Sequence, residues 1–424
     1  MTTLSPPASD TPSFEELAHR CLEDCAALAD QSEWHEGILR QYLSLPMKAV
    51  HELSQNWMAE LGMEARVDDA GNLIGRRASA AASAPIVLTG SHLDTVPGAG
   101  KYDGVLGFVM GLALARSLGT AELPFHIDVI GFSEEEGVRF SKPYLGSHAI
   151  TGTFDLEWLS RRDASGFSMK SVIEGFGLVP QRIPSAAYRP SEVIAFVEPH
   201  IEQGVVLSRA DLPVGVVEAI AGQTRALVQF VGIAGHAGTT PMYPRQDALV
   251  AAASWITEVS RRGCEVTGCR ATVGYADVSP NVRNVIPDRV TLSLDLRHID
   301  DGIRKQSVGQ LFDIARGIAV RDNVEFVVLE KQEQSGVAMD DVIRKQLFQA
   351  ASDCDLEALD LISGAGHDAG LMASRFPTAM IFIRQPRGIS HHPDEDVEAS
   401  DIAEGLRVLR QWVLNLAEGI NSNG

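Results

Sequence analysis

Four short apolar segments of this chain each lead to histidine or carboxylate residues. The segments, residues 85–89, 129–133, 193–197 and 379–383, have the length and the aliphatic or aromatic content of buried strands. They lead in turn to His92-Leu93-Asp94, Glu134-Glu135-Glu136, Glu198-Pro199-His200 and Ser390-His391-His392. In open α/β sheets, ligands bind outside the carboxyl ends of the strands. The four segments therefore predict an α/β sheet with a polar site along one edge.

The first of these motifs has the spacing of a metal-binding histidine with a supporting carboxylate. Side chains two residues apart on a strand point to the same face, so His92 and Asp94 would lie side by side. Asp94 would then accept the proton of one ring nitrogen of His92 and leave the other nitrogen for a metal ion. Taken alone, the same spacing also fits a histidine–aspartate pair that only stabilises the fold.

Three adjacent carboxylates, Glu134, Glu135 and Glu136, follow the second segment. Like charges so close together repel one another, and without a nearby cation the pKa of at least one of them must rise. A divalent metal ion would remove this conflict. Because four separate strand ends carry potential ligands, we interpret the set as a functional site rather than as a solvated surface.

The order of expected elements indicates two domains. Over the first half of the chain, helices expected at residues 17–28, 50–61 and 105–118 alternate with strands, and a turn at 69–72 joins two of these strands. After residue 214, strands at 225–231, 271–278, 290–296 and 324–329 alternate with helices at 246–261 and 303–319. This βαββαβ order describes a complete four-stranded sheet with two helices on one face.

The predicted fold is therefore an α/β, doubly wound core with an inserted α+β domain of ferredoxin-like order. Residues 1–214 form the first part of the core domain, residues 215–332 the insert and residues 333–424 the second part. The chain is expected to return to the core because the histidines near its end have to join His92 in one site.

The charge balance excludes two classes of partner. The 424 residues carry a formal net charge of −20, and no run of lysine and arginine occurs. A nucleic acid or an anionic membrane surface needs such basic patches, so neither is an expected partner. A small anionic molecule would have to be bound by individual arginines.

The cysteines and the N-terminus indicate a cytoplasmic protein. The five cysteines form no CxxC pair, which favours free thiols in a reducing cytosol. Cys21 and Cys25 lie four residues apart, and we expect both on the buried face of a helix. Residues 1–7 lack the features of a secretory signal and are expected to form a short disordered arm. No apolar run of 18 residues occurs, so no membrane span is expected.

Several motifs together resemble those of a known group of enzymes. They are His92, Asp103, Glu135-Glu136, His200 in HIEQG, His236 in GHAGTTPM, Asp295-Leu296-Arg297, SGAGHDAG and SHHPDE. In this order, and over nearly the whole chain, they resemble the hydantoinase/carbamoylase amidases of the dinuclear-metal amidohydrolase and peptidase family. Within that group, GQTR at residues 222–225 is most similar to allantoate amidohydrolases, followed by N-carbamoyl-L-amino acid hydrolases.

The resemblance implies a metallohydrolase core that holds two divalent metal ions, zinc or manganese. Asp103 would bridge both ions, His92 and His200 would complete one site, and Glu136 and His391 would complete the other. In the peptidase branches of the family, the residue at the position of His200 usually resembles a carboxylate. The imidazole of His200 therefore indicates the amidase branch. The neighbouring histidine at 392 is the alternative to His391.

The resemblance also assigns catalytic roles. Glu135 would be the general base, which takes a proton from the attacking water and delivers it to the leaving nitrogen. Asp94 would support His92. His236, in a glycine-flanked loop, resembles the oxyanion-stabilising histidine that reaches the active site of a dimer partner in this family. The insert would thus serve as a lid and as the interface of a homodimer.

The expected substrate is a small anionic ureido compound. The guanidinium of Arg297 can bind a carboxylate through two hydrogen bonds. Asn284 and Gln203 would bind carbamoyl or carboxylate oxygens, and Gly366 would offer its backbone amide. Without the family pattern, a surface arginine and two turn amides are the simpler interpretation. The roles of Thr224 and of His392 stay open.

These roles predict hydrolysis of a linear amide or ureido C–N bond, in allantoate or in an N-carbamoyl-L-amino acid. Two alternatives are a metallo-exopeptidase of the same family and a non-catalytic scaffold on this fold. His200 in HIEQG argues against the peptidase, and the intact Glu135 beside Glu136 argues against the scaffold.

Overall fold

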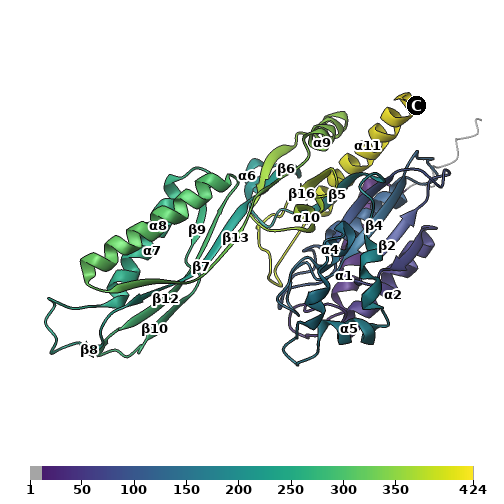
Figure 1. The fold of residues 1–424 in the computed structure, drawn as a ribbon. Coiled ribbons are helices and arrows are strands. Elements are labelled where there is room, and N and C mark those ends of the chain that lie inside the picture. The colour runs from purple at the N-terminus through teal and green to yellow at the C-terminus, as the bar shows by residue number, and fades with distance from the viewer. Residues whose placement is uncertain (1–11, 424) are drawn as a thin grey trace, which may run out of the picture. The chain divides into compact units, whose positions relative to one another are not determined.

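The structure, a computed structural model, describes residues 12–423, so the predicted N-terminal arm lies outside the described residues. The chain forms two compact units (Figure 1). The first comprises the residues up to Glu218 and those from Met339 onward, and the second comprises Ala219–Ala338. The predicted insert, residues 215–332, differs from the second unit by a few residues at each end. Its role as a lid or dimerisation domain stays a prediction.

The first unit is built on a mixed β-sheet whose centre is parallel. Its strand order is β1-β2-β4-β3-β5-β16-β6, with β15 also paired to β6, and β14 extends the sheet by pairing with the last two residues of β6, which belong to the second unit. The parallel strands are β3 (Ile86–His92), β4 (His126–Phe132), β5 (Val193–Ile201) and β16 (Thr378–Ile383). They coincide with the four predicted segments, and every residue of β3, β4 and β16 is buried. The predicted α/β fold class is confirmed.

The edges of the sheet differ from a purely parallel, doubly wound sheet because they are antiparallel. On one side, β1 (Glu64–Val67) and β2 (Leu73–Arg77) form a hairpin that pairs with β4. The carboxylate of Asp68 accepts two backbone amides in its turn, so a short loop suffices. The other side adds β6 (Val214–Ile220), β15 (Leu359–Ser363) and the two-residue β14 (Val337–Ala338).

Helix α3 (Val105–Ser117) places the loop that carries Asp103. It contacts β3, β4 and β5 and is apolar on all sides, with Arg116 as its only residue that is not buried. Gly107 lets it approach the sheet closely, since a Cβ there would lie 2.0 Å from the carbonyl oxygen of Pro199. Because this packing fixes the start of α3, it also fixes Asp103, two residues before the helix.

The other helices cover the sheet and its loops. α1 (Phe14–Ala29) and α11 (Ala399–Asn423) pack on α3, and Cys21 and Cys25 are buried on α1 as predicted. The remaining helices are α2 (Leu45–Glu60), α4 (Leu145–Thr151), α5 (Met169–Phe176), α6 (Val206–Ala210), α9 (Asp341–Asp353) and α10 (Asp368–Met372), with 3-10 turns at η1 (Leu156–Ser160) and η2 (Pro180–Ala186). Within residues 12–423, no helix has the length and apolar character needed to span a membrane.

The second unit is an antiparallel sheet of order β10-β12-β7-β13 with two helices packed against it. Its elements are β7 (Gly222–Val231), α7 (Ala248–Glu265), β9 (Arg270–Thr272), β10 (Ala276–Ser279), β12 (Arg289–His298), α8 (Asp301–Asp322) and β13 (Glu325–Gln334), plus a short pair, β8 (Gly235–His236) and β11 (Val285–Ile286). Alternate residues of β7 and β12 are buried against α7 and α8.

The predicted strand at 271–278 is wrong in one respect, because β9 and β10 are separate segments along β12. Between them, the hydroxyl oxygen of Ser293 accepts the backbone N–H groups of Gly274 and Tyr275. A side chain thus replaces part of the backbone ladder at this point, which hydrophobic alternation alone does not reveal.

Candidate active site

The carboxyl ends of the four parallel strands bring the predicted ligands together in the first unit. His92 ends β3 and His200 lies near the end of β5, while Glu136 follows β4 and His391 follows β16. These strands are neighbours in the sheet, so residues far apart in the sequence meet at one edge. Asp103 joins them from the loop before α3.

Two groups of potential metal ligands share Asp103. In the first, His92, Asp103 and His200 have ligand atoms within 4.8 Å of one another, and His200 Nε2 lies 3.3 Å from Asp103 Oδ1. In the second, His391 Nε2 lies 3.0 Å from Asp103 Oδ2 and 3.4 Å from Glu136 Oε1. The two oxygens of one carboxylate therefore face two groups, which is the arrangement that a bridging ligand needs.

The hydrogen bonds of these side chains fit a metal ion. Nδ1 of His92 lies 2.9 Å from the backbone carbonyl oxygen of Asp94, and Nδ1 of His200 lies 2.9 Å from that of Ile201. A carbonyl oxygen only accepts, so Nδ1 is the donor in both rings and Nε2 is the nitrogen left for a metal ion. His200 Nε2 and Asp103 Oδ2 are buried and make no hydrogen bond, although His391 Nε2 lies 3.0 Å from Asp103 Oδ2. A cation would satisfy both atoms.

Negative charge is concentrated at this edge of the sheet. Burial raises the pKa of Glu135 well above its usual value, and the carboxylates of Glu136 and Asp368 raise it further. Burial also raises the pKa of Glu136, to about 7. Burial acts in the same direction on Asp103, but the surrounding histidines outweigh it and hold the pKa of Asp103 below its ordinary range. Divalent cations would supply the positive charge that this edge lacks.

Asp94 does not bond the ring of His92 in the way that the sequence predicted. Its nearest carboxylate oxygen lies 3.9 Å from His92 Nδ1. β3 ends at His92, so the two-residue alternation of a strand no longer applies to Asp94. Its carboxylate instead accepts the backbone N–H groups of Glu135 and Glu136, at 3.0 and 3.1 Å. Asp94 therefore positions the loop that carries these two glutamates.

Gln203 is bonded to the ligand group rather than free for a substrate. Its Nε2 donates to Asp103 Oδ1 at 3.0 Å and to Ser390 Oγ at 3.2 Å. Its Oε1 is buried without a hydrogen-bond partner. Of the side-chain atoms of Gln203, Oε1 is therefore the one that could contact a substrate. This contact stays a prediction.

Gly366 lies in the loop before α10, close to Tyr144. A Cβ at this position would lie 2.1 Å from the Tyr144 hydroxyl oxygen, so a residue without a side chain is required. The close approach of Tyr144 therefore explains why position 366 is a glycine, independently of substrate binding. Its predicted amide contact with a substrate stays a prediction.

Sequence reasoning assigned no role to four buried residues that support this edge: Glu198, His367, Asp368 and Glu395. Glu395 accepts the backbone N–H groups of Tyr102 and Asp103, and so holds the loop before α3. His367 Nε2 lies 2.8 Å from Ser363 Oγ, and its ring packs on that of His200. The signal was present, since all four lie within or directly beside the motifs EPHIEQG, SGAGHDAG and SHHPDE.

Glu198, His200 and His367 also come close enough to hold an ion. The imidazole of His200 has only one free nitrogen, however, because its Nδ1 donates to a backbone carbonyl. That nitrogen lies 3.3 Å from Asp103. The third group is therefore not an independent metal site but a layer of side chains behind the first.

Three predicted residues lie in the second unit. His236 and Asn284 meet at the β8–β11 pair, where the backbone carbonyl of Asn284 accepts the amide that follows His236, and both residues are exposed. Arg297, near the end of β12, donates to both carboxylate oxygens of Asp295 at 2.8 and 2.9 Å. Arg225 of β7 bonds the same carboxylate. Contacts of these residues with a substrate stay a prediction.

The structure clarifies two residues that the sequence left open. Thr224 is fully buried and its hydroxyl is bonded by the guanidinium of Arg304, so it faces the core of the second unit. His392 is exposed, and its Nδ1 accepts the backbone N–H of Asp394. Of the two histidines, His391 is the one that joins the group around Asp103.

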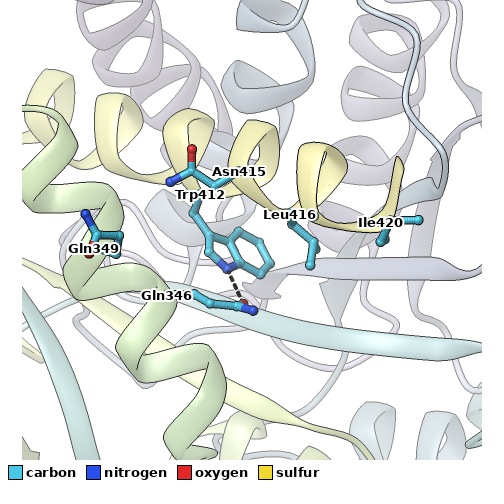
Figure 2. Close-up of a pocket in the computed structure, with 7 residues that line it drawn as sticks. Gln346, Gln349, Trp412, Asn415, Leu416 and Ile420 are labelled. Atoms are coloured by element: carbon cyan, nitrogen blue, oxygen red, sulfur yellow. Dashed lines mark hydrogen bonds between the residues drawn. The ribbon is translucent and has the colours of Figure 1, made fainter. Parts of the chain in front are cut away.

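An open pocket of about 620 Å³ lies away from this edge, between α9 and α11 (Figure 2). Its polar groups bond one another or the adjacent helix, since Trp412 Nε1 donates to Gln346 Oε1 and Asn415 Nδ2 donates to Asp353 Oδ2. Its lining contains neither histidine nor carboxylate, so it is not a candidate for hydrolytic chemistry.

Comparisons with known proteins identify the family of the chain. The profile of peptidase family M20/M25/M40 matches residues 88–415. The chain is 38% identical over 385 residues to an N-carbamoyl-L-amino acid amidohydrolase of Geobacillus stearothermophilus, which covers 90% of this chain and 94% of that protein. It is 36% identical over 366 residues to an allantoate amidohydrolase of Bacillus subtilis, which covers 85% and 88%.

Solved structures point to the same group. A hydantoinase/carbamoylase family amidase of Burkholderia multivorans has a TM-score of 0.88 and 35% identity, covering 94% of this chain and 98% of that one. A tripeptidase of Staphylococcus aureus, with a TM-score of 0.66 and 16% identity, shares only the fold. The chain therefore belongs to peptidase family M20/M25/M40 and, within it, to the hydantoinase/carbamoylase amidases, and it is an amidohydrolase.

Proposed function

We propose that this protein hydrolyses a linear ureido or amide C–N bond in a small carboxylate substrate, using two divalent metal ions and Glu135 as the general base. The observation that carries the proposal is the single carboxylate of Asp103 between two groups of ligands. Glu135 lies in reach of His92 and of Glu136, and so beside one residue of each group. A base in this position can serve a water held between the two groups.

The donor set supports the assignment of the metal ions. His92, Asp103 and His200 would hold one ion, and Asp103, Glu136 and His391 would hold the other. Imidazole and carboxylate donors suit zinc and manganese alike, so either metal is consistent with the site. Such ions, when bound, polarise a carbonyl oxygen and lower the pKa of water.

Glu135 has the environment of a proton carrier. Its side chain is almost fully buried, and burial favours its protonated form. The carboxylate of Asp94 holds the backbone N–H of Glu135, which fixes the start of this side chain relative to β3. Glu135 would take the proton of the attacking water and pass it to the leaving nitrogen.

The substrate class follows from the relatives and from the proposed contacts. Allantoate and N-carbamoyl-L-amino acids, after which the two relatives are named, each carry a ureido group and a carboxylate. Arg297 would bind the carboxylate, while Asn284, Gln203 Oε1 and the amide of Gly366 would bind the ureido oxygens and nitrogens. The two relatives are similarly close in sequence, so both compounds are candidate substrates.

We also propose a homodimer formed through the second unit, in which His236 stabilises the oxyanion in the partner's site. Large apolar side chains near the β8–β11 pair support it, since Ile233, Met242 and Tyr243 are 60%, 78% and 90% exposed. Such a group is typical of a protein–protein interface. A cytoplasmic location is proposed from the five free cysteines, and cell fractionation tests it.

Substitution of Glu135 separates the base from the ligands. Glu135→Gln keeps the shape of the side chain but cannot take up a proton, so turnover is expected to fall about 100- to 10,000-fold while metal content persists. Glu136→Gln, one residue on, is the matched control and is expected to act by losing metal. Turnover and elemental analysis measure both effects. Near wild-type turnover of fully metal-loaded Glu135→Gln would exclude Glu135 as the base.

Arg297 tests the substrate class. Arg297→Ala removes the proposed partner of the substrate carboxylate, and we expect a loss of about 2–5 kcal/mol in binding that largely disappears with a ureido analogue lacking the carboxylate. Arg225→Ala is the matched control, because Arg225 bonds the same Asp295. Ammonia release is measured with allantoate, N-carbamoyl-L-amino acids and N-carbamoyl-β-alanine, and release of free amino acids is measured with a dipeptide. Cleavage of the dipeptide alone would replace the amidase proposal with a peptidase.

Mixing of inactive variants tests donation of His236 across the dimer. Heterodimers of His236→Ala and Glu135→Gln chains are expected to regain part of the activity, because one of their two sites carries neither substitution. A mixture of Glu135→Gln and Asp103→Ala is the control and is expected to stay inactive, since both residues belong to the first unit. Absence of recovery despite proven subunit exchange would contradict the proposal.

A further inference from the structure

The parallel centre of the first unit consists of two strand pairs with a seam between them. β3 and β4 pair as far as His92 with Phe132, and β5 and β16 pair as far as Ile201 with Ile383. The ladder between β3 and β5 ends earlier, at Thr89 with Val197. Beyond that point, no backbone ladder joins the two pairs, although both continue to the edge that carries the ligand groups.

Both ligand groups span this seam. In the first group, His92 comes from the β3–β4 side and His200 from the β5–β16 side. In the second, Glu136 follows β4 and His391 follows β16. The width of the seam therefore sets the distances between ligands in both groups, and something other than the backbone ladder must fix it.

Glu198 bridges the seam at this level. It is fully buried in β5, and its Oε1 accepts a hydrogen bond from Ser91 Oγ of β3 at 2.6 Å. Its Oε2 accepts the backbone N–H of Ala369, at the start of α10, at 2.7 Å. Each partner is close in sequence to a proposed site residue: Ser91 precedes His92, and Ala369 follows the loop of Gly366.

Helix α3 packs against the same junction. A Cβ on Gly107 would lie 2.0 Å from the carbonyl oxygen of Pro199 and 2.8 Å from Ser91 Cβ. The helix thus approaches closely both Ser91, the donor of this bond, and Pro199, the residue after Glu198. A buried carboxylate is costly, and here two short hydrogen bonds offset that cost while they hold three segments together.

We propose that Glu198 is a positioning residue that fixes the separation of the strand ends carrying His92 and His200 and seats the loop carrying Gly366. The inference rests on the proposed metal-dependent function, because its consequence is the geometry of the metal ligands. Residues that orient metal ligands in this way typically contribute 10- to 100-fold to metal affinity, in order of magnitude.

The experiment measures the affinity of the metal-free full-length chain for Zn²⁺ by competition with a chelator. Ser91→Ala, which breaks only the bond across the seam, is expected to raise the Kd about 10- to 100-fold. Glu198→Ala is expected to raise it at least as much, and the double variant no further, since both remove the same bond. Glu198→Gln is expected to recover part of the affinity, because its amide can donate to Ser91 Oγ and accept from Ala369.

Thr89→Val is the matched control. The hydroxyl of Thr89 also donates across β3 and β5, to the carbonyl of Val197 at 2.9 Å, but at the last rung of the ladder. Its loss is expected to leave Zn²⁺ affinity unchanged. Thermal unfolding of each metal-free variant checks its fold, and the absorption spectrum of Co²⁺-loaded chains reports a change in ligand geometry without any measurement of activity.

The outcomes separate this inference from the proposed function. If the wild-type chain binds no Zn²⁺, the proposed metal centre fails and the inference fails with it. If the wild type binds Zn²⁺ and a folded Ser91→Ala variant binds it equally well, only the inference is overturned. Loss of affinity in Glu198→Gln together with unchanged affinity in Ser91→Ala would make Glu198 itself a ligand and would also overturn the positioning role.

Discussion

Repulsion between buried carboxylates is the constraint on which this site depends. The buried carboxylates of Asp94, Asp103 and Glu135 and the half-buried one of Glu136 converge at one edge of a sheet whose interior is apolar. Each charge needs a partner in such an environment. The carboxylate of Asp94 accepts two backbone N–H groups, and that of Asp103 lies beside histidines. For Glu135, by contrast, burial and like charges favour the protonated form. Two divalent ions would turn this unfavourable arrangement into a set of ligands with a base beside them.

The sheet also brings together, at the same edge, proposed ligands that lie far apart in the sequence. Glu136 and His391 are separated by most of the chain, and only the neighbouring ends of β3, β4, β5 and β16 bring their loops together. The side-chain contacts that then fix the loops, those of Asp94, Glu198 and Glu395, all use a carboxylate to accept backbone or hydroxyl hydrogens. Carboxylates therefore serve both as proposed ligands and as supports of the loops that carry them.

Much of this architecture was predictable because apolar strands followed by His, Asp or Glu are a local pattern. The bond from His92 to the Asp94 carboxylate was predicted wrongly, since the alternation of a strand stops where β3 stops. The roles of Glu198 and His367 were not predicted because their partners, Ser91 and Ser363, are ordinary residues whose proximity only the fold creates. Roles in the second unit were inferred from the resemblance alone.

The central claim is that Asp103 is shared by two metal ions. Anomalous diffraction from crystals of the Zn²⁺-reconstituted protein, with data above and below the zinc absorption edge, tests it most directly. The account predicts two peaks per chain, each about 2.0–2.2 Å from one carboxylate oxygen of Asp103. One of them would also contact His92 and His200, and the other Glu136 and His391. A single peak, or a peak between Glu198 and His367 that does not touch Asp103, would contradict the account.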